Sequence, residues 1–330
     1  MSSSIPGPRD LPASRHDLST YWGRVKHSAD LCDPRTLFAS STALASATTL
    51  IQTYRNSPTP TAFTPSHWNA KKILDATLHP DTGLPVFLPF RMSCFIFSNL
   101  IVTAGMLQPN LTTRGVLAWQ ITNQTLNVAI NSANANKSSP PSWTQMGTSF
   151  VLAVGASCGV ALGLGRAVDR LKNVKPNTKV LLGRLVPFAA VCSAGIVNVG
   201  LMRGGEILAG IDVFRKVPSE KSGDAVTENL GKSRIAAAIA VGETAVSRVL
   251  NAAPIMVVPP IVLMALQKRG LKNKFVIPAN IGLIFATSVF ALPLALGAFP
   301  QRQKISPERL EEKFHGKGGV GGVVEFNRGI

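Results

Sequence analysis

Carboxamide side chains recur along one stretch of the chain that has the length of a helix. Asn123, Asn127 and Asn131 stand four residues apart, and Gln120 and Gln124 accompany them. On a helix this spacing places them on one face. An unpaired amide is costly in hydrocarbon, so the face must turn toward protein or a water-filled cavity. Amides donate and accept hydrogen bonds, which suits a zwitterionic solute. Hydrogen bonding between packed helices is the alternative.

Ionisable residues inside apolar segments are the second set of candidates, because a charge within a membrane is costly and by default indicates function. Glu243 and Ser247 share a helix face. Arg248 lies about 140° round the helix from Glu243, so we expect its partner on another helix. Arg91 and Arg184 lie near the ends of predicted spans, where snorkelling toward head groups is the simpler explanation. The three arginines could also hold an anion, which keeps a carboxylate substrate open.

A short polar motif stands immediately before the first predicted span: His79, Pro80, Asp81, Thr82 and Gly83. Proline favours an extended backbone at the residue before it. The aspartate can accept backbone N–H groups, and the glycine permits a tight turn. The motif therefore predicts a turn at the membrane surface, and a contact that gates a path is the sharper alternative.

Further along the chain, Arg203 and Glu206 have the spacing of a surface ion pair of small energetic value. The four cysteines and five histidines are scattered, which predicts neither a metal site nor a disulfide framework. No nucleophile, base and orienting group are brought together by any motif. We therefore expect no enzyme activity, no metal and no cofactor.

The composition indicates a membrane protein. Of the 330 residues, 45% are hydrophobic and only 15% charged, whereas a soluble domain carries about 25% charged residues. The net charge is +17, but the basic residues are spread among connectors such as 166–179 and 268–274. Basic connectors beside apolar spans favour contact with lipid head groups, and they do not predict a nucleic-acid partner.

Several segments reach the roughly 20 apolar residues that cross a bilayer. We predict an all-α membrane protein of about five transmembrane helices plus one polar, amide-rich helix that faces protein; six spans remain possible. The predicted spans are 86–107, 147–165, 180–202, 235 to about 255, and 275–299, and the polar helix is 115–135. Pro254, Pro259 and Pro260 predict that the chain after the fourth of these spans is a bent segment near the surface.

These spans divide the chain into three parts. Residues 1–85 form an extramembrane segment with helices over 37–55 and 66–78, residues 86–299 form the transmembrane domain, and residues 300–330 form a tail. The tail contains a glycine cluster over 316–322 that lacks the Lys-Ser/Thr ending of a phosphate-binding loop, so we expect it to be flexible. The first residues have no apolar core of a secretory signal.

Taken in order, the motifs resemble those of the sideroflexin family. They are WGRVKHSADLCDPRTL at 22–37, HPDTG at 79–83, NQTLN at 123–127, RLVPFAAV at 184–191, LMRGGEI at 201–207, SRVLNAAP at 247–254, Pro259-Pro260 and the final FNRGI. The chain departs from the family pattern at Leu84, where an acid is usual, and at 131–135, which lacks an aromatic and an arginine. Glu243 and the length of the connector 212–232 also look unusual.

The resemblance implies a multi-pass protein of the mitochondrial inner membrane without a cleaved presequence. Some members of the family import serine for one-carbon metabolism, and others are tied to respiratory-complex assembly or iron homeostasis. We therefore expect a transporter of serine or a similar small neutral amino acid, with the amide face, Glu243, Ser247 and Arg248 along its path. The alternatives are a non-transporting scaffold with inner-membrane protein partners and a carrier of a carboxylate such as citrate.

Overall fold

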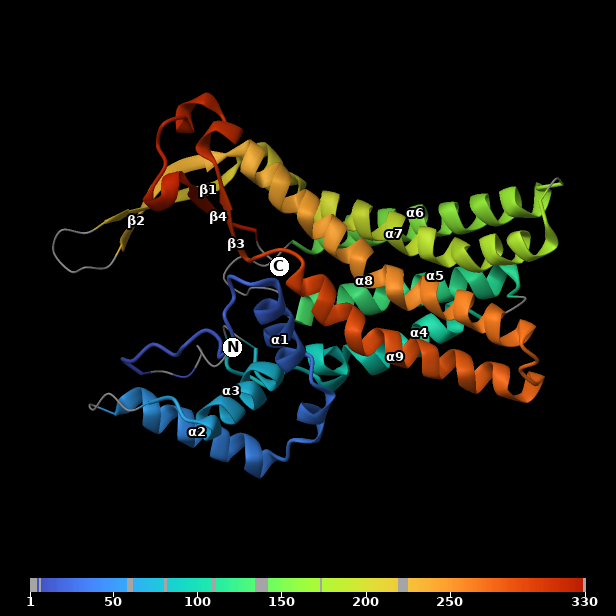
Figure 1. Cartoon of the computed structure of the whole chain (residues 1–330), viewed down its shortest axis with the longest axis horizontal. Helices are drawn as coiled ribbons and strands as arrows, with labels where there is room; N and C mark the ends of the chain where they lie inside the picture. The colour runs from blue at the N-terminus through green and yellow to red at the C-terminus, as the bar shows by residue number, and fades with distance from the viewer. Residues whose placement is uncertain are drawn as a thin grey trace.

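The computed structural model describes residues 5, 7–57, 62–79, 82–108, 111–133, 142–172, 174–218 and 225–328. Over these residues the chain is mainly helical, with one small sheet (Figure 1). The α-helices are α1 Tyr21–Leu31, α2 Ser41–Asn56, α3 Pro65–Thr77, α4 Phe95–Met106, α5 Thr113–Ala133, α6 Trp143–Arg170, α7 Pro176–Ala209, α8 Arg234–Lys268 and α9 Val276–Gly297. The strands are β1 Ile211–Pro218, β2 Ala225–Ser233, β3 Arg302–Ile305 and β4 Val324–Asn327.

The N-terminal segment is a small helical unit with its own core, as the sequence predicts. Its three helices start at hydroxyl side chains, since Thr20, Ser40 and Thr64 each accept a hydrogen bond from a backbone N–H of the first turn. Such caps satisfy amides that a helix start leaves without partners. Ile51 of α2 and Leu74 of α3 are fully buried against each other's helices. Helices are thus confirmed in both predicted regions, although α2 begins at Ser41 after the 3₁₀ helix Pro34–Phe38, and the sequence does not predict α1.

Four helices, α6 to α9, are long and apolar enough to cross a membrane. Large hydrophobic side chains on all four point outward, among them Val151, Ile196, Val258 and Phe290, which are 39% to 66% exposed. In water so extended an apolar surface would be strongly unfavourable, whereas lipid covers it. The shorter apolar helix α4 and the amide-rich helix α5 accompany the four, which agrees with the predicted set of membrane helices.

Two helices differ from their predicted bounds. Within the span expected over 86–107, the α-helix begins only at Phe95. Two 3₁₀ turns precede it, and the first of them contains Pro89. The end predicted for the next-to-last span near 255 is wrong, since α8 continues through its three prolines to Lys268. Pro259 and Pro260 are buried, so packing against neighbouring helices holds the kinked segment in the bundle.

The C-terminal residues do not form the flexible tail that the glycine cluster predicts. They fold onto the connector between α7 and α8, which is itself the hairpin β1–β2, and the antiparallel sheet has the order β2-β1-β4-β3. Val213 of β1, Phe314 and Phe326 of β4 are almost fully buried together. Burial of these apolar side chains explains why the segment is ordered despite its glycines.

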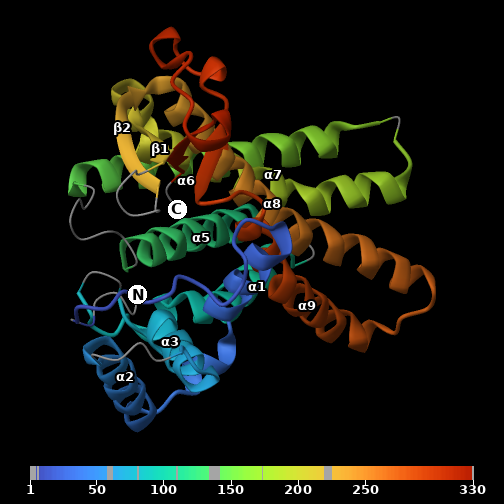
Figure 2. The same cartoon turned by 60° about the vertical axis from the view of Figure 1, so that its left-hand side comes forward.

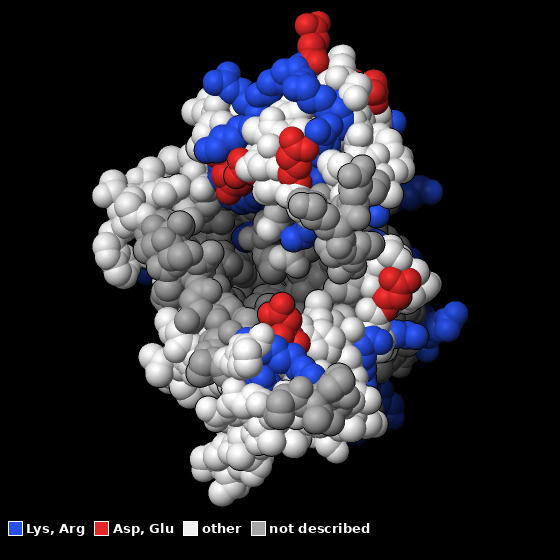
Figure 3. Space-filling model, turned by 90° about the vertical axis from the view of Figure 1, so that its left-hand side faces the viewer, with Lys and Arg blue, Asp and Glu red and all other residues white. Residues whose placement is uncertain are grey.

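The sheet and the N-terminal helices lie at the same end of the helical bundle, and the turns between α6 and α7 and between α8 and α9 lie at the opposite end (Figures 1 and 2). The side chain of Arg24 on α1 donates to the carbonyl oxygen of Gly297 at the end of α9, at 2.9 Å. Seen from the sheet end, the surface is hollowed between the sheet and the N-terminal helices, and Lys and Arg are numerous over the sheet (Figure 3). We call this the sheet end of the molecule.

Candidate functional site

The amides of α5 form a face that passes from buried to exposed along the helix. Gln120 is 1% exposed, and Asn123 and Gln124 are each 4% exposed. Asn127 is half-buried and Asn131 is exposed. The carboxyl end of α5 points toward the sheet end (Figure 1), so the amide face becomes more exposed in the direction of that end.

Two atoms of this face are buried without a hydrogen-bond partner among the described residues: Gln120 Oε1 and Asn123 Nδ2. One is an acceptor and the other a donor. Leaving such a group unpaired costs about 1–3 kcal/mol. Hydrogen bonding between packed helices would require partners that the described residues do not supply, whereas a polar solute or water could satisfy both atoms. That these residues line a path stays a prediction.

The position of α5 depends on a close contact with α4. Gly105 of α4 lies directly against the indole of Trp119, the residue before Gln120. On the other side, Val116 packs against α6 and α7 at Ala161 and Ala190. The buried amides are therefore held by apolar contacts on both sides, which fixes the direction in which their side chains point.

The candidates on α8 do not form one group. Ser247 donates a hydrogen bond to the carbonyl oxygen of Ala295 on α9, at 2.9 Å, and so ties two helices together. Glu243 accepts a hydrogen bond from Gln303 Nε2 of β3 at 2.8 Å through one oxygen, and its other oxygen is buried without a partner among the described residues. Arg248 lies beside Gly195 of α7. The sequence predicts a partner for Arg248 on another helix, and within the described part of the chain no hydrogen bond or ion pair to it is formed.

Arg203 and Glu206 do form the predicted ion pair, with 2.6 Å between Nη2 and Oε2. The pair is only partly at the surface, because the Glu206 side chain is 40% exposed whereas that of Arg203 is 13% exposed. It also donates to Thr244 of α8 at 2.8 Å and to the carbonyl oxygen of Arg328 at 2.6 Å. Arg203 thus joins α7, α8 and the C-terminal residues, which sequence spacing alone could not show.

The predicted turn at 79–83 is confirmed for the residues that are described; Pro80 and Asp81 lie outside them. The N–H of His79 donates to Leu84 at 2.8 Å and that of Gly83 donates to His79 at 3.0 Å. Gly83 has φ +67°, a conformation that glycine adopts without strain. Thr82 caps the N–H of Leu84. The turn joins α3 to the start of the membrane helices. Its role as a gate stays a prediction.

The two arginines predicted to snorkel bond within the protein. Arg91 Nε donates to the carbonyl oxygen of Val86 at 2.8 Å. Arg184 Nη2 contacts Gln267 Oε1 of α8 at 3.4 Å, and its Nη1 is buried without a partner among the described residues. Neither arginine forms a hydrogen bond to the amide face among the described residues.

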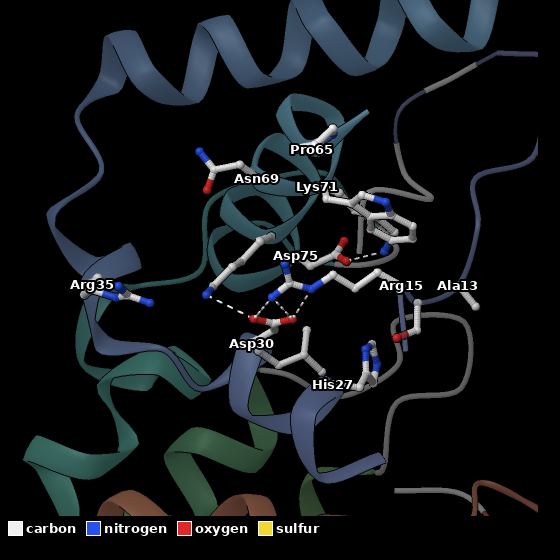
Figure 4. Close-up of a pocket in the computed structure, with 13 residues that line it drawn as sticks. Ala13, Arg15, His27, Asp30, Arg35, Pro65, Asn69, Lys71 and Asp75 are labelled. Atoms are coloured by element: carbon white, nitrogen blue, oxygen red, sulfur yellow. Dashed lines mark hydrogen bonds and ion pairs between the residues drawn. The ribbon is translucent and has the colours of Figure 1, made fainter. Parts of the chain in front are cut away.

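A cavity of about 240 Å³ lies in the N-terminal segment (Figure 4), and the residues that line it come from positions 13–75. Asp30 pairs there with Arg15 at 2.9 Å and with Lys72 at 3.1 Å, and Lys71 pairs with Asp75. Burial raises the pKa of Asp30, but Lys72 and Arg15 outweigh it, so the net pKa lies below the ordinary value.

The charges in this cavity satisfy one another, which indicates a structural ion-pair network more than a ligand site. Sequence reasoning missed the network. The run WGRVKHSADLCDPRTL places Lys26 one helical turn before Asp30, so its sequence does not show that Asp30 pairs instead with Arg15 and with Lys72 of α3. Over the described residues, no group of His, Cys, Asp and Glu side chains could hold a metal ion.

Comparison with known proteins gives one consistent result. A family model for the sideroflexins matches residues 10–330. The chain is 56% identical to the sideroflexin FSF1 of Saccharomyces cerevisiae, with 100% of both chains covered, and 56% identical to that of Schizosaccharomyces pombe, with 97% and 98% covered. It is 35% identical to human sideroflexin-1, with 96% of this chain and 95% of the relative covered. No solved structure matches the chain.

Proposed function

Because this chain belongs to the sideroflexin family, we propose that it transports serine or a similar small neutral amino acid across the mitochondrial inner membrane, in support of one-carbon metabolism. The proposal takes the membrane character from the four long apolar helices. It takes the location and the metabolic role from the resemblance of the sequence to the family. No part of the mechanism assigned to the chain requires a covalent step.

The observation that carries the proposal is the graded amide face of α5. A solute that crosses a membrane through a protein needs polar groups that replace its hydration inside the bundle. Gln120 and Asn123 offer an unpaired acceptor and an unpaired donor at the buried end, and Asn131 continues the face to the exposed end. A helix that only packed against its neighbours would gain nothing from leaving both atoms unpaired.

The chemistry of the face favours a neutral amino acid over citrate. Its members carry no charge, and each amide both donates and accepts. The carboxylate, ammonium and hydroxyl groups of serine need donors and acceptors in similar number. Citrate carries three carboxylates and would need several cations around it, whereas the face offers none.

Uptake into proteoliposomes tests the proposal. The purified chain is reconstituted in lipid vesicles, and uptake of labelled serine, alanine, glycine and citrate is compared. We expect uptake of serine and a loss of at least tenfold in Asn123→Leu, since one amide is removed and an apolar side chain fills its place. Thr122→Val is the matched control. Thr122 is exposed on the same helix, and its hydroxyl donates to the carbonyl oxygen of Ala118, one turn earlier.

The alternatives give different results in the same experiment. A carrier of carboxylates would take up citrate in preference to serine. A scaffold would take up none of the four solutes, and single cysteines at 123 and 127 would then resist aqueous reagents although the chain inserts normally. Absence of uptake of every amino acid in a correctly folded preparation would end the carrier proposal.

A further inference from the structure

Three arginines converge where α7, α8 and the C-terminal residues meet, and we call them the arginine cluster: Arg203, Arg248 and Arg328. Arg203 donates to the backbone carbonyl of Arg328 and to the hydroxyl of Thr244, and Arg248 follows Thr244 by about one turn of α8. Arg328 is only 6% exposed and stacks over the ring of Phe299, with 5.5 Å between the guanidinium carbon and the ring centre. The cluster is assembled from segments that are far apart in the sequence.

Among the described residues, positive charge exceeds negative charge at this place. The carboxylates beside the cluster are those of Glu243 and Glu206, and Glu206 already forms an ion pair with Arg203. Burial lowers the pKa of the Arg328 guanidinium below its ordinary value; Glu243 opposes this effect, and Arg203 and Arg24 add to it. Buried charges are normally paired, since an uncompensated one is strongly destabilising. The excess therefore needs an anion that the described residues do not provide.

The cluster also has free hydrogen-bonding capacity directed into the protein. Arg328 Nε and Nη1 are buried without a partner among the described residues, although a guanidinium has five N–H donors. Glu243 Oε2 and Gln303 Oε1 are buried and unpaired in the same way, while their other side-chain atoms bond to each other at 2.8 Å. Two kinds of group are thus unsatisfied together, donors on the arginine and acceptors on the glutamate and glutamine.

Arg248 extends the cluster into the membrane part of the bundle. It follows Glu243 by five residues on α8, about 7.5 Å further from the sheet end. Its guanidinium has no hydrogen-bond or ion-pair partner among the described residues, and Cβ and Cδ of its side chain lie at van der Waals distance from the position that a Cβ on Gly195 would take. A second unpaired cation is therefore available deeper along the same helix.

We propose that the arginine cluster binds the carboxylate group of an amino acid, with Arg328 as the first contact and Arg248 as the second, while Glu243 and Gln303 accept from the ammonium group. A guanidinium matches a carboxylate in two parallel hydrogen bonds. This inference rests on the proposed function for the identity of the solute, but the chemistry that it assigns is recognition of a carboxylate. The amide face supplies none of that charge.

Binding to the purified full chain in lipid nanodiscs tests this inference without transport. The probes are serine, glycolate, which has a carboxylate but no ammonium group, serinamide, which lacks the carboxylate, and inorganic phosphate. We expect serine to bind most tightly, glycolate to bind more weakly and serinamide not to bind. Arg328→Gln should weaken serine binding roughly 10- to 100-fold, and Arg328→Lys should restore only part of it, because an ammonium lacks the planar fork.

Two further variants keep the result interpretable. Lys304→Gln removes a cation from the same strand as Gln303, but its side chain is 66% exposed, so serine binding should be unchanged. Arg248→Gln breaks no bond in the described structure, so a weaker binding in this variant reports the ligand and not the fold. Serine binding by Arg328→Gln and Arg248→Gln as tight as in the wild type would overturn the inference. So would serinamide binding as tight as serine, or binding of inorganic phosphate alone.

The outcomes for the two proposals can be separated. If the wild type binds serine and glycolate in the manner described but vesicles take up no solute, the transport proposal fails and the carboxylate site stands. If vesicles take up serine and Arg328→Gln leaves the KM unchanged, the carboxylate site fails and transport stands.

Discussion

The contact between α4 and α5 is tight enough that one methyl group should displace the amide face. A Cβ on Gly105 would lie 2.2 Å from ring carbon Cε2 of Trp119, where ordinary contacts begin at 3.4 Å. The rigid indole or the whole helix must therefore move by roughly 1 Å. Such overpacking costs about 3 kcal/mol, against a gain of about 1 kcal/mol for alanine over glycine in a helix. Gly105→Ala should thus be destabilised by about 2 kcal/mol.

Thermal unfolding of the detergent-solubilised chain measures this effect, and a decrease in Tm of about 4 °C is expected for that loss. Gly155→Ala on α6 is the matched control, because a Cβ there meets no atom within 4 Å. It should keep or raise the Tm. A cysteine placed at Gln120 should also become more accessible to aqueous reagents in Gly105→Ala. If Gly105→Ala unfolds at the same temperature as Gly155→Ala, the close α4–α5 contact and the positioning argument built on it are refuted.

Three further changes test the rest of the assembly. Gly297→Ala would place a Cβ 2.6 Å from Cγ2 of Val25, so α1 should detach from α9 and limited proteolysis should cut near α1 faster. Glu311→Gln should cost about 1–2 kcal/mol, because the carboxylate accepts from the first residues of α8. Burial acts to raise the pKa of Glu311, but the hydrogen bond from the Ser233 hydroxyl, together with those from the start of α8, outweighs burial and holds the pKa low. The stabilisation by this carboxylate is therefore complete above pH roughly 4.3 and is lost as the pH falls further, and it should be missing from the pH–stability profile of the variant. Asp33→Asn should lower the unfolding free energy in urea by about 2 kcal/mol through the lost bond to Lys72.

The sequence is sufficient to predict the membrane class, the amide helix and the order of the apolar helices, because each depends on local composition and periodicity. It could not decide which face of a helix meets a neighbour. On α6, two stripes of small residues run in parallel: Ala153, Ser157 and Ala161 are buried, whereas the positions facing Gly155 and Gly159 are open. Both stripes satisfy the same spacing rule for helix packing. Only the three-dimensional arrangement of α7 distinguishes them.

The sheet and the arginine cluster were missed for a different reason. Strand β4 pairs with β1 across more than a hundred residues, and a pairing at that separation is not encoded in the local pattern of either strand. Arg328 belonged to a segment that was expected to be a flexible tail. The burial of Arg328 depends on the contact of its guanidinium with Phe299 and on the hydrogen bond from Arg203 to its own carbonyl oxygen. No local sequence pattern encodes either contact.

The pairing of β4 with β1 and β3 explains how a charged cluster can exist at the end of an apolar helical bundle. Lipid favours helices whose outward faces are apolar, so the cost of burying Arg203 and Arg328 must be offset at the sheet end, where the chain leaves the membrane part. Strand β4 places the Arg328 carbonyl against Arg203, and β3 places Gln303 against Glu243. Each contact satisfies one polar group and leaves another unpaired beside it. The sheet therefore holds the cluster in position without neutralising it, which is the condition that a site for a transient anionic group requires.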